Sequence, residues 1–499
     1  MPSETPSSPW HPRLAFLTLG LGMVAFTVTL TSLCRDKSAG LMPEWPLDLT
    51  FFHNLVWNVT AGFGYRQSAT YHEPPGIFNE THFEPILLLA APFYAAFPGL
   101  DTLFAVQAGL LSLGAVGVYR LARSGGAVPL FAAGAGLVYL SWWPVWRMAM
   151  ADIRPLTWCI PMLLLCAAAL REGRRTETLL WGLLACLSRE EVPLIVAGLG
   201  ATAVVWRAGT EEHRRAVRGL GVRLGFAAVV FLVVSTLMRS NASFYIRPDE
   251  WIERFLSGDS SDQQDAWGRE PAEMLSVRLA FLKEWLVPAG LAAILAPELL
   301  IGAIPLFAYL FSQSHEWAGW EGPYIHHSAP AVALVAAAAA LGLPRAIVRF
   351  LPPGRARPAV GAVLLLVFLG GHRALLGGYH ERVILAEIDP WRDQHPEVVE
   401  AWRLAGLVPS DAVVMADYSS VHIFSGRRYV YCYEQEEFEP VWPAEPGSPL
   451  LPKAETQPHW ALVRLDHDAW RSRTAGAGLV ERAMGARWVL FGPPSSESR

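Results

Sequence analysis

Long apolar stretches constrain what this chain can fold into more than any other feature. Residues 14–33 read LAFLTLGLGMVAFTVTLTSL, and comparable runs recur as far as residue 376. A helix needs about 20 consecutive apolar residues to cross the hydrocarbon core of a bilayer. The charged fraction is 17%, whereas soluble proteins average about 25%. We therefore predict an all-α polytopic membrane protein.

The distribution of Lys and Arg predicts how the helices cross the membrane. The run at residues 14–33 is too long for the core of a signal peptide and lacks a clean cleavage site, so we interpret it as a transmembrane helix. Short arginine-rich loops should face the cytoplasm. This rule gives about eleven helices, several of them shorter than a full span, with the N-terminus inside.

Two segments do not fit single spans. Arginines flank both ends of residues 178–206, so two short helices should meet at SREEVP, with the charges of that turn facing outward. The stretch FEPILLLAAPFYAAF has about 15 residues and two prolines, which favours an interfacial or re-entrant helix. It lies in the first outer loop, residues 34–101.

The end of the chain has a different composition. Residues 377–499 are polar and acidic, and strand-like AVVMAD, RRYVYCY, HWALVRLD and ARWVLFG alternate with helix-like PEVVEAWRLAGLVP. We predict a polytopic domain over residues 1–376 and a small extracytoplasmic α/β domain over residues 377–499. The five cysteines form no CxxC motif, which excludes a disulfide framework or a zinc signature.

Asp48 is the first candidate for chemistry. It follows the first span and begins the amphipathic segment DLTFFHNLVWN. A carboxylate at the membrane surface can act as a general base, a metal ligand or a cation-recognition group. The alternative is a helix N-cap, because Asp48 directly precedes an apolar periodic run.

Four further clusters carry polar side chains that the topology places at the outer face. Each is a weak signal alone, and His-x-Glu is a weak metal motif. The candidates are Glu73, His82 and Glu84 in the first outer loop, Asp152 and Arg154 in MADIRPLTW, Arg189 and Glu190 in SREEVP, and Tyr324, His326 and His327 in GPYIHHSAP. Together they predict a cavity for an amphipathic, phosphate-bearing substrate, in which Arg154 or Arg189 binds phosphate and a carboxylate deprotonates a hydroxyl.

These motifs resemble a known family. DLTFFHNLVWN, THFEPILLLAAPFYAAFP, LSREEVPL and PELLIGAIPLFAYLFS followed by YIHHSAP are similar to bacterial membrane proteins of domain of unknown function 2079. That family resembles the GT-C glycosyltransferases, which use polyprenyl-phosphate sugars. The resemblance implies that Asp48 is the catalytic base, that His82 opens the second interfacial helix of the loop, and that Glu190 and Arg189 form an acidic and basic pair. Where relatives have Asp-Phe-His-Pro, this chain has Asp-Ile-Arg-Pro at residues 152–155.

The expected function is transfer of a sugar from a polyprenyl-phosphate donor to an acceptor at the outer face of the cytoplasmic membrane. Asp48, Glu84 and Glu73 would be catalytic, and the other candidates would bind substrate. No cofactor is certain, and a divalent cation held by Asp48 and His82 stays open. Alternatives are a transporter or flippase for a lipid-linked or anionic solute, and a non-catalytic assembly protein. No basic face with interleaved aromatic residues supports nucleic-acid binding, and the oligomeric state stays open.

Overall fold

The computed structural model describes most of the helical part of the chain and much of its C-terminal domain. The described residues are 10–43, 45–69, 83–206, 209–238, 292–303, 328–352, 357, 359–364, 394–433 and 458–494. Glu73, His82, Tyr324, His326 and His327 lie outside them, as does the expected domain boundary at residues 376 and 377.

Within the described residues, five helices are long and apolar enough to span a membrane. They are Pro12–Ala39, Leu100–Ser124, Pro155–Glu172, Glu211–Ser235 and Ala329–Phe350. The corresponding elements are α1 (Trp10–Ala39), α4 (Leu100–Ser124), η2 (Pro155–Trp158) with α7 (Cys159–Glu172), α10 (Glu211–Met238) and α15 (Ala329–Phe350). The polytopic helical prediction holds at this level, whereas the count of about eleven extends beyond the described residues.

Shorter elements complete the bundle. They are α2 (Pro46–Thr60), η1 (Pro85–Ala90), α3 (Ala91–Ala96), α5 (Pro129–Ser141), α6 (Trp143–Met150), α8 (Arg175–Cys186), α9 (Val192–Val205) and η3 (Pro297–Ala303). The expected pair of short helices on either side of SREEVP is present as α8 and α9. The expected short helix after Glu84 is present as η1 and α3, whose prolines keep it from forming one regular span.

Two apolar runs do not coincide with single helices. Residues 129–146 form two helices, because Trp142 is extended and separates α5 from α6. Pro144 has no N–H to continue the hydrogen bonds of α5, so a new helix begins there. The apolar run at residues 331–343 continues as a helix through Pro344 to Phe350.

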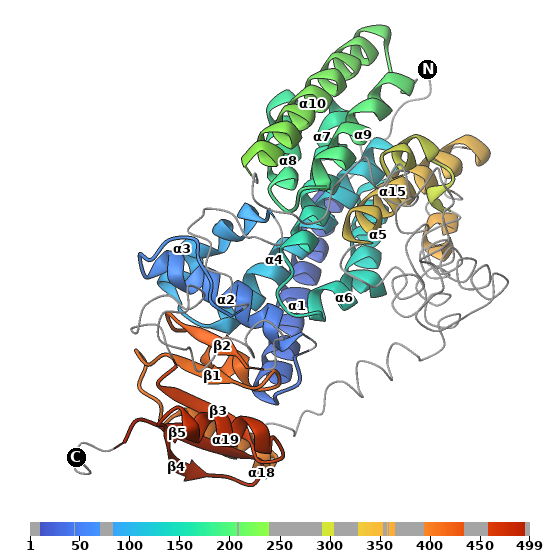
Figure 1. Cartoon of the computed structure of the whole chain (residues 1–499). Helices are drawn as coiled ribbons and strands as arrows, with labels where there is room; N and C mark the ends of the chain where they lie inside the picture. Colours follow the sequence, from blue (N-terminus) through green and yellow to red (C-terminus); the bar gives the residue numbers. More distant parts are fainter. Residues whose placement is uncertain are drawn as a thin grey trace, which may run out of the picture.

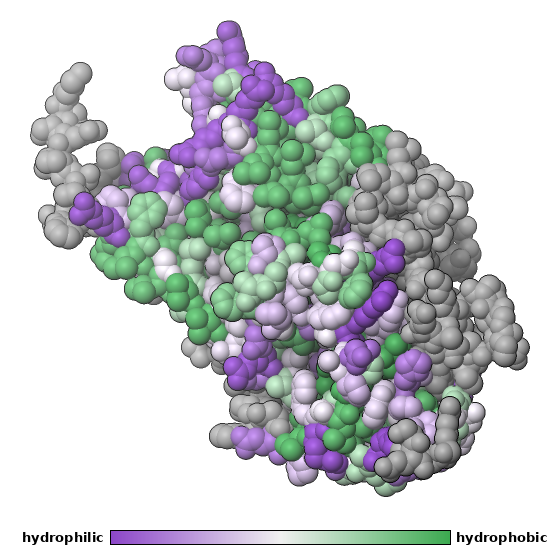
Figure 2. Space-filling view, turned by 90° about the vertical axis from the view of Figure 1, so that its left-hand side faces the viewer, coloured by the Kyte–Doolittle hydropathy of each residue, from purple (hydrophilic) through white to green (hydrophobic). Residues whose placement is uncertain are grey.

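Apolar side chains cover much of the bundle surface. On α1 and α10 the exposed residues include Phe16, Leu21, Val24, Val222 and Phe226. In Figure 2 a broad hydrophobic surface lies between strongly hydrophilic side chains at the upper end and the mixed surface of the lower end. Soluble monomers rarely expose such continuous apolar surface, so this face is suited to contact with lipid.

The C-terminal part forms a mixed sheet below the bundle in Figure 1. Its strand order is β2-β1-β3-β5-β4, with β1 parallel to β2 and β3, and β5 antiparallel to β3 and β4. The strands are β1 (Val414–Ala416), β2 (Val430–Cys432), β3 (Trp460–Arg464), β4 (Val480–Met484) and β5 (Trp488–Gly492), with helices α18 (Pro396–Ala405), η7 (Val421–Phe424) and α19 (Asp468–Gly476). The four expected strands and α18 are present, and β4 and α19 were not expected.

Buried hydrogen bonds join this sheet domain to α2. His53 Nδ1 lies 2.6 Å from Ser425 Oγ, and its Nε2 lies 2.7 Å from Tyr94 Oη. Because the Ser425 hydroxyl donates to the carbonyl of His422, Nδ1 of His53 donates and Nε2 accepts. Burial lowers the pKa of His53 to about 3, so its ring is neutral. The two parts of the chain are therefore tied together through polar groups that water does not reach.

Asn54 forms three hydrogen bonds with backbone groups at this junction. Its Nδ2 donates to the carbonyl oxygens of Ser425 and Arg427 at 3.3 and 2.6 Å, and its Oδ1 accepts from Ser68 N at 3.1 Å.

Asn54→Leu would leave these buried backbone groups without partners, at a cost of about 1–3 kcal/mol each. We expect a lower thermal unfolding midpoint and faster proteolysis between α2 and the sheet. Trp402→Phe is the control, because it removes one exposed bond to Ala39 O. Equal midpoints for both variants would contradict this account of the junction.

Candidate functional site

The segment between α6 and η2 carries the central charged residues. Asp152 has a φ of +61°, a left-handed conformation that is uncommon for residues other than glycine. Its Oδ2 accepts a hydrogen bond of 2.7 Å from Trp45 N, at the start of α2. Asp152 thus connects this turn directly to the helix that carries Asp48.

Arg154 and Asp48 form an ion pair. The Arg154 side chain is 6% exposed and the Asp48 side chain 40% exposed, so the cation is buried and the carboxylate faces outward. Arg154 Nε also donates to Ala151 O at 3.1 Å, whereas its buried Nη2 has no hydrogen-bond partner. The guanidinium therefore keeps one unused donor group beside an accessible carboxylate.

Asp48 does not cap its helix. The residue before α2 is Trp45, Pro46 opens the helix, and Asp48 lies within the first turn without a side-chain cap bond. A carboxylate there interacts favourably with the helix dipole. The N-cap alternative is wrong in its geometry, and the ion pair with Arg154 explains the position of Asp48.

Gln107 of α4 holds this turn in place, although it was not among the residues predicted to form the site. Its Nε2 donates to Ala149 O at 3.0 Å and Asp152 O at 2.5 Å. Its Oε1 accepts from Arg154 N at 2.8 Å and Trp158 Nε1 at 3.1 Å. All four hydrogen-bonding positions of the amide are used. A lone glutamine in an apolar helix is the available signal, since buried polar groups in membranes usually serve a specific partner.

A second cluster joins the first outer loop to the turn between α8 and α9. Phe83 N donates to Glu190 Oε2 at 2.9 Å, and Ile86 N donates to Leu187 O at 3.0 Å. Arg189 lies 3.2 Å from Glu191 through its Nε. The structure thus brings Glu84, Arg189 and Glu190 together, and η1 contacts η2 next to Arg154.

Glu84 is almost fully buried within this second cluster. Burial raises the pKa of its carboxyl to about 8, with Glu190 and Glu191 acting in the same direction and Arg189 against it. Its Oε2 has no hydrogen-bond partner, while its backbone oxygen accepts from Tyr65 Oη at 3.1 Å. At neutral pH Glu84 is therefore mainly protonated and suited to donate a hydrogen bond.

The sheet domain also faces this region. Tyr418 follows β1, and Asp417 fixes that turn by accepting from Ser419 Oγ at 2.5 Å and from Ser420 N at 3.0 Å. Burial and the negative charge of Asp48 raise the pKa of Tyr418 to about 12, which shows that the phenol lies within range of the first cluster. Sequence patterns gave no indication that this distant segment returns to the site.

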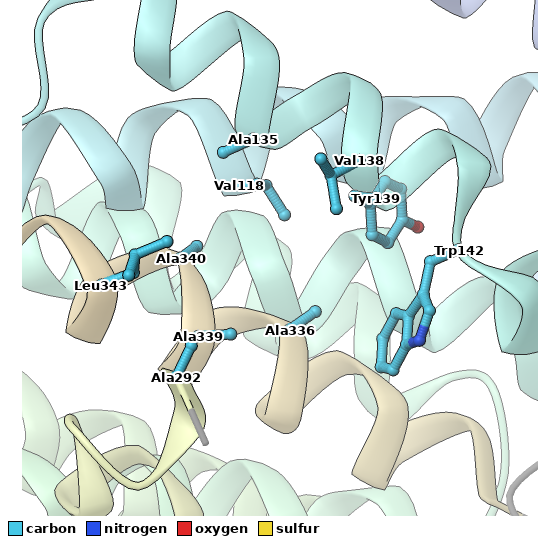
Figure 3. A pocket seen from close by; sticks show the side chains of 10 residues that line it. All are labelled: Val118, Ala135, Val138, Tyr139, Trp142, Ala292, Ala336, Ala339, Ala340 and Leu343. Carbon is cyan, nitrogen blue, oxygen red and sulfur yellow. The ribbon is translucent and has the colours of Figure 1, made fainter. Parts of the chain in front are cut away.

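A separate apolar hollow lies between α4, α5 and α15 (Figure 3). Its empty volume is about 510 Å³ when the adjoining open solvent is included, and small aliphatic side chains form most of the wall. The Tyr139 hydroxyl donates to Leu111 O at 2.9 Å, whereas the buried indole N–H of Trp142 has no partner. The described residues that line it include no carboxylate, histidine or guanidinium.

Replacing Glu84 should change how stability depends on pH. The carboxyl has a folded pKa of about 8 against an ordinary value of 4.5, so the folded state binds its proton more tightly. Its contribution to stability is complete below pH 4.5 and is lost as the pH rises to about 8. Glu84→Gln mimics the protonated form, so its unfolding midpoint should match wild type at acidic pH and exceed it above pH 8. Parallel pH profiles of the two midpoints would show that Glu84 titrates normally.

Replacing Gln107 should disorder the turn at residues 149–154. Gln107→Leu leaves Asp152 O, Arg154 N and Trp158 Nε1 without a partner, each at a cost of about 1–3 kcal/mol, whereas Ala149 O keeps its bond from Cys34 Sγ. We expect a large drop in the thermal unfolding midpoint. Ser112→Ala is the control on the same helix, since its hydroxyl bonds within the helix to Gly109 O at 2.7 Å. If Gln107→Leu lowered the unfolding midpoint no more than Ser112→Ala does, Gln107 would not hold the turn.

Comparison with solved structures shows where this fold occurs. The chain is similar to ArnT from Cupriavidus metallidurans bound to undecaprenyl phosphate, with a TM-score of 0.52, 14% identity, and coverage of 95% of this chain and 99% of that one. The apo form of ArnT gives a TM-score of 0.48 at 11% identity, covering 95% and 100%. An Archaeoglobus fulgidus oligosaccharyltransferase in complex with Zn and sulfate gives 0.40 at 11% identity, covering 94% and 74%.

At 14% identity the comparison with ArnT bound to undecaprenyl phosphate shows a shared fold and no more. The neighbours are GT-C glycosyltransferases, the group that the sequence resemblance implied. Among curated proteins, none matches the chain in sequence. Residues 45–440 match the family described as "Predicted membrane protein (DUF2079)", a stretch that runs from the start of α2 past β2. The chain therefore belongs to the DUF2079 family of membrane proteins.

Proposed function

We propose that this protein is a glycosyltransferase that moves a sugar from a polyprenyl-phosphate donor to an acceptor hydroxyl at the outer face of the cytoplasmic membrane. One observation carries the proposal, namely the buried Arg154 guanidinium with an unused Nη2 beside the accessible carboxylate of Asp48. A phosphate-binding group and a base are the two elements that this reaction requires. The ArnT structure with undecaprenyl phosphate supports a lipid of this class.

The ion pair suggests an order of events. Phosphate accepts two hydrogen bonds from a guanidinium more favourably than a single carboxylate oxygen does. A donor phosphate at Arg154 would therefore compete with Asp48 and release its carboxylate. The same substrate that provides the leaving group would then prepare the base.

The chemistry follows from this arrangement. Asp48 takes the proton of the acceptor hydroxyl, whose oxygen forms a bond to the anomeric carbon. The bond between that carbon and the phosphate oxygen breaks, and the phosphate leaves with the electron pair. Arg154 stabilises the charge that develops on the phosphate, so no covalent enzyme intermediate is needed.

The second cluster would support the donor or acceptor. Glu84 would donate a hydrogen bond as a neutral acid, and Arg189 would add positive charge near the phosphate. Glu73, His82, Tyr324, His326 and His327 stay candidates outside the described residues. A divalent cation would be held by Asp48 with His82. Among the residues that the structure describes, no group of three or more His, Cys, Asp or Glu side chains gathers to hold a metal.

The apolar hollow in Figure 3 fits the lipid part of such a donor. Trp142 at its edge precedes α6, an eight-residue helix that spans about 12 Å and leads to the Asp152–Arg154 turn. A prenyl chain in the hollow would thus extend toward the phosphate position. The proposed orientation keeps the N-terminus inside and the sheet domain outside, where its turn at Tyr418 would border the acceptor.

Native mass spectrometry of the full chain in nanodiscs tests the proposal. Asp48→Asn keeps Arg154 as the phosphate-binding group and removes the base. This variant should therefore retain polyprenyl phosphate and accumulate its sugar conjugate. Arg154→Gln should lose both lipids by about tenfold or more, because a charged hydrogen bond contributes about 1.5–3 kcal/mol. Arg428→Gln is the control, since Arg428 is exposed and stacks on Phe63 with its Cζ 4.4 Å from the ring centroid.

The outcomes separate the candidate functions. The sugar conjugate on Asp48→Asn but not on wild type would support a transferase. Equal amounts of conjugate on both would favour a transporter or flippase, which carries its lipid unchanged. Absence of polyprenyl lipid from all four proteins, or its full retention by Arg154→Gln, would contradict the proposed role of Arg154.

A further inference from the structure

Two half-buried arginines and a buried tryptophan form a second group at the opposite end of the helices from Asp48 and Arg154. Arg171 ends α7, Trp206 follows α9, and Arg345 lies near the end of α15. Residues 154 and 171 are separated along one helical segment by about 25 Å at 1.5 Å per residue. In Figure 1 this end of α7 and α9 lies away from the sheet domain.

The indole of Trp206 lies against both arginines. Arg171 Cζ is 4.0 Å from the ring centroid and Arg345 Cζ is 5.8 Å from it. Cation–π contacts of this kind attract a guanidinium to the ring face. They do not cancel its charge, so two like charges remain close together around one ring.

A single described carboxylate balances these two charges. Glu298 of η3 forms an ion pair with Arg345, and that pair is internally neutral. Arg171 has no carboxylate within ion-pairing distance among the described residues, and nearby Glu172 is paired with Arg120 and Arg174. Counted over the described residues, the group around Trp206 therefore carries one positive charge in excess.

Two hydrogen-bond donors in this group are also unused. Trp206 is 3% exposed, yet its indole N–H has no partner, and the buried Nη1 of Arg171 has none either. A buried donor without a partner costs about 1–3 kcal/mol. Since Arg171 rests on the ring of Trp206, both donors belong to side chains in direct contact and can serve one ligand.

Excess positive charge and two unused donors together describe an oxyanion site. A phosphate group provides negative charge and several acceptor oxygens. α7 and α15 are candidate membrane spans, so their ends should lie at the level of lipid headgroups. Basic pockets between helix ends are a known way to hold anionic headgroups.

We propose that Arg171, Trp206 and Arg345 bind the phosphate of an anionic membrane phospholipid. Arg171 Nη1 and the Trp206 N–H donate to its oxygens, and Arg345 adds charge while paired with Glu298. This site is separate from the proposed transferase site in position and in ligand. It would fix the helix ends to the anionic leaflet, and its failure would leave the proposed function untouched.

The test measures how much phosphatidylglycerol the full chain retains in nanodiscs of phosphatidylcholine with and without that lipid. Native mass spectrometry would count bound lipids on wild type, Arg171→Gln, Trp206→Phe and Arg349→Gln. Trp206→Phe keeps an aromatic ring but removes the N–H, so it stays informative if Arg171→Gln fails to fold. Arg349→Gln is the matched control, because Arg349 is exposed on the same end of α15.

We expect wild type to prefer phosphatidylglycerol, with an affinity about tenfold lower in Arg171→Gln and about fivefold lower in Trp206→Phe. Arg349→Gln should stay within about twofold of wild type, as exposed charges contribute little. Equal retention by all four proteins would overturn the site. Inorganic phosphate that stabilised wild type but not Arg171→Gln in pure phosphatidylcholine, with no preference for phosphatidylglycerol, would overturn the assignment to lipid.

Discussion

The burial of Arg154 is the constraint on which the end of the bundle next to the sheet domain depends. A guanidinium removed from water loses several kcal/mol of hydration, which only a nearby negative charge and hydrogen bonds can offset. Asp48 supplies the charge, and the carbonyl of Ala151 accepts from Nε. Asp48 can reach Arg154 only if α2 begins beside the turn at residues 149–154. The hydrogen bond from Trp45 N to Asp152 Oδ2 holds the start of α2 in that position. Gln107 then holds the turn itself, so the first loop, α4 and α6 are all positioned around one cation.

Buried polar contacts also join the helical bundle to the sheet domain through α2. His53, Asn54 and Ser68 direct their polar groups into the sheet domain instead of into water. Buried polar contacts of this kind are highly directional, and losing one partner costs more than the bond contributes. The family match, which continues through β2, agrees with this view. The sheet is thus part of the site's framework, and Tyr418 is one consequence of that attachment.

Much of this arrangement could be predicted from sequence because it depends on local patterns. Apolar runs predicted the spans, flanking arginines predicted the break between α8 and α9, and prolines predicted the short elements after Glu84. Residues 152–154 and 189–190 contact the first loop, because turns at the same end of a helical bundle lie close together. β4 was missed because its side chains are mostly exposed and lack alternation. Gln107 and Tyr418 were missed because their partners are far away in sequence, where no spacing rule applies.

The two arginine clusters show that one physical problem has two solutions within this fold. At the end next to the sheet domain, Arg154 is balanced by an acid that is partly exposed, so an incoming anion can exchange with Asp48 and the pair can respond to substrate. At the other end, Arg171 rests on the face of an indole, which attracts the cation but cannot neutralise it. An anion bound there displaces no carboxylate from Arg171 and releases no base. The first arrangement is suited to turnover and the second to lasting attachment, and this difference follows from whether a carboxylate or an aromatic ring accompanies the guanidinium.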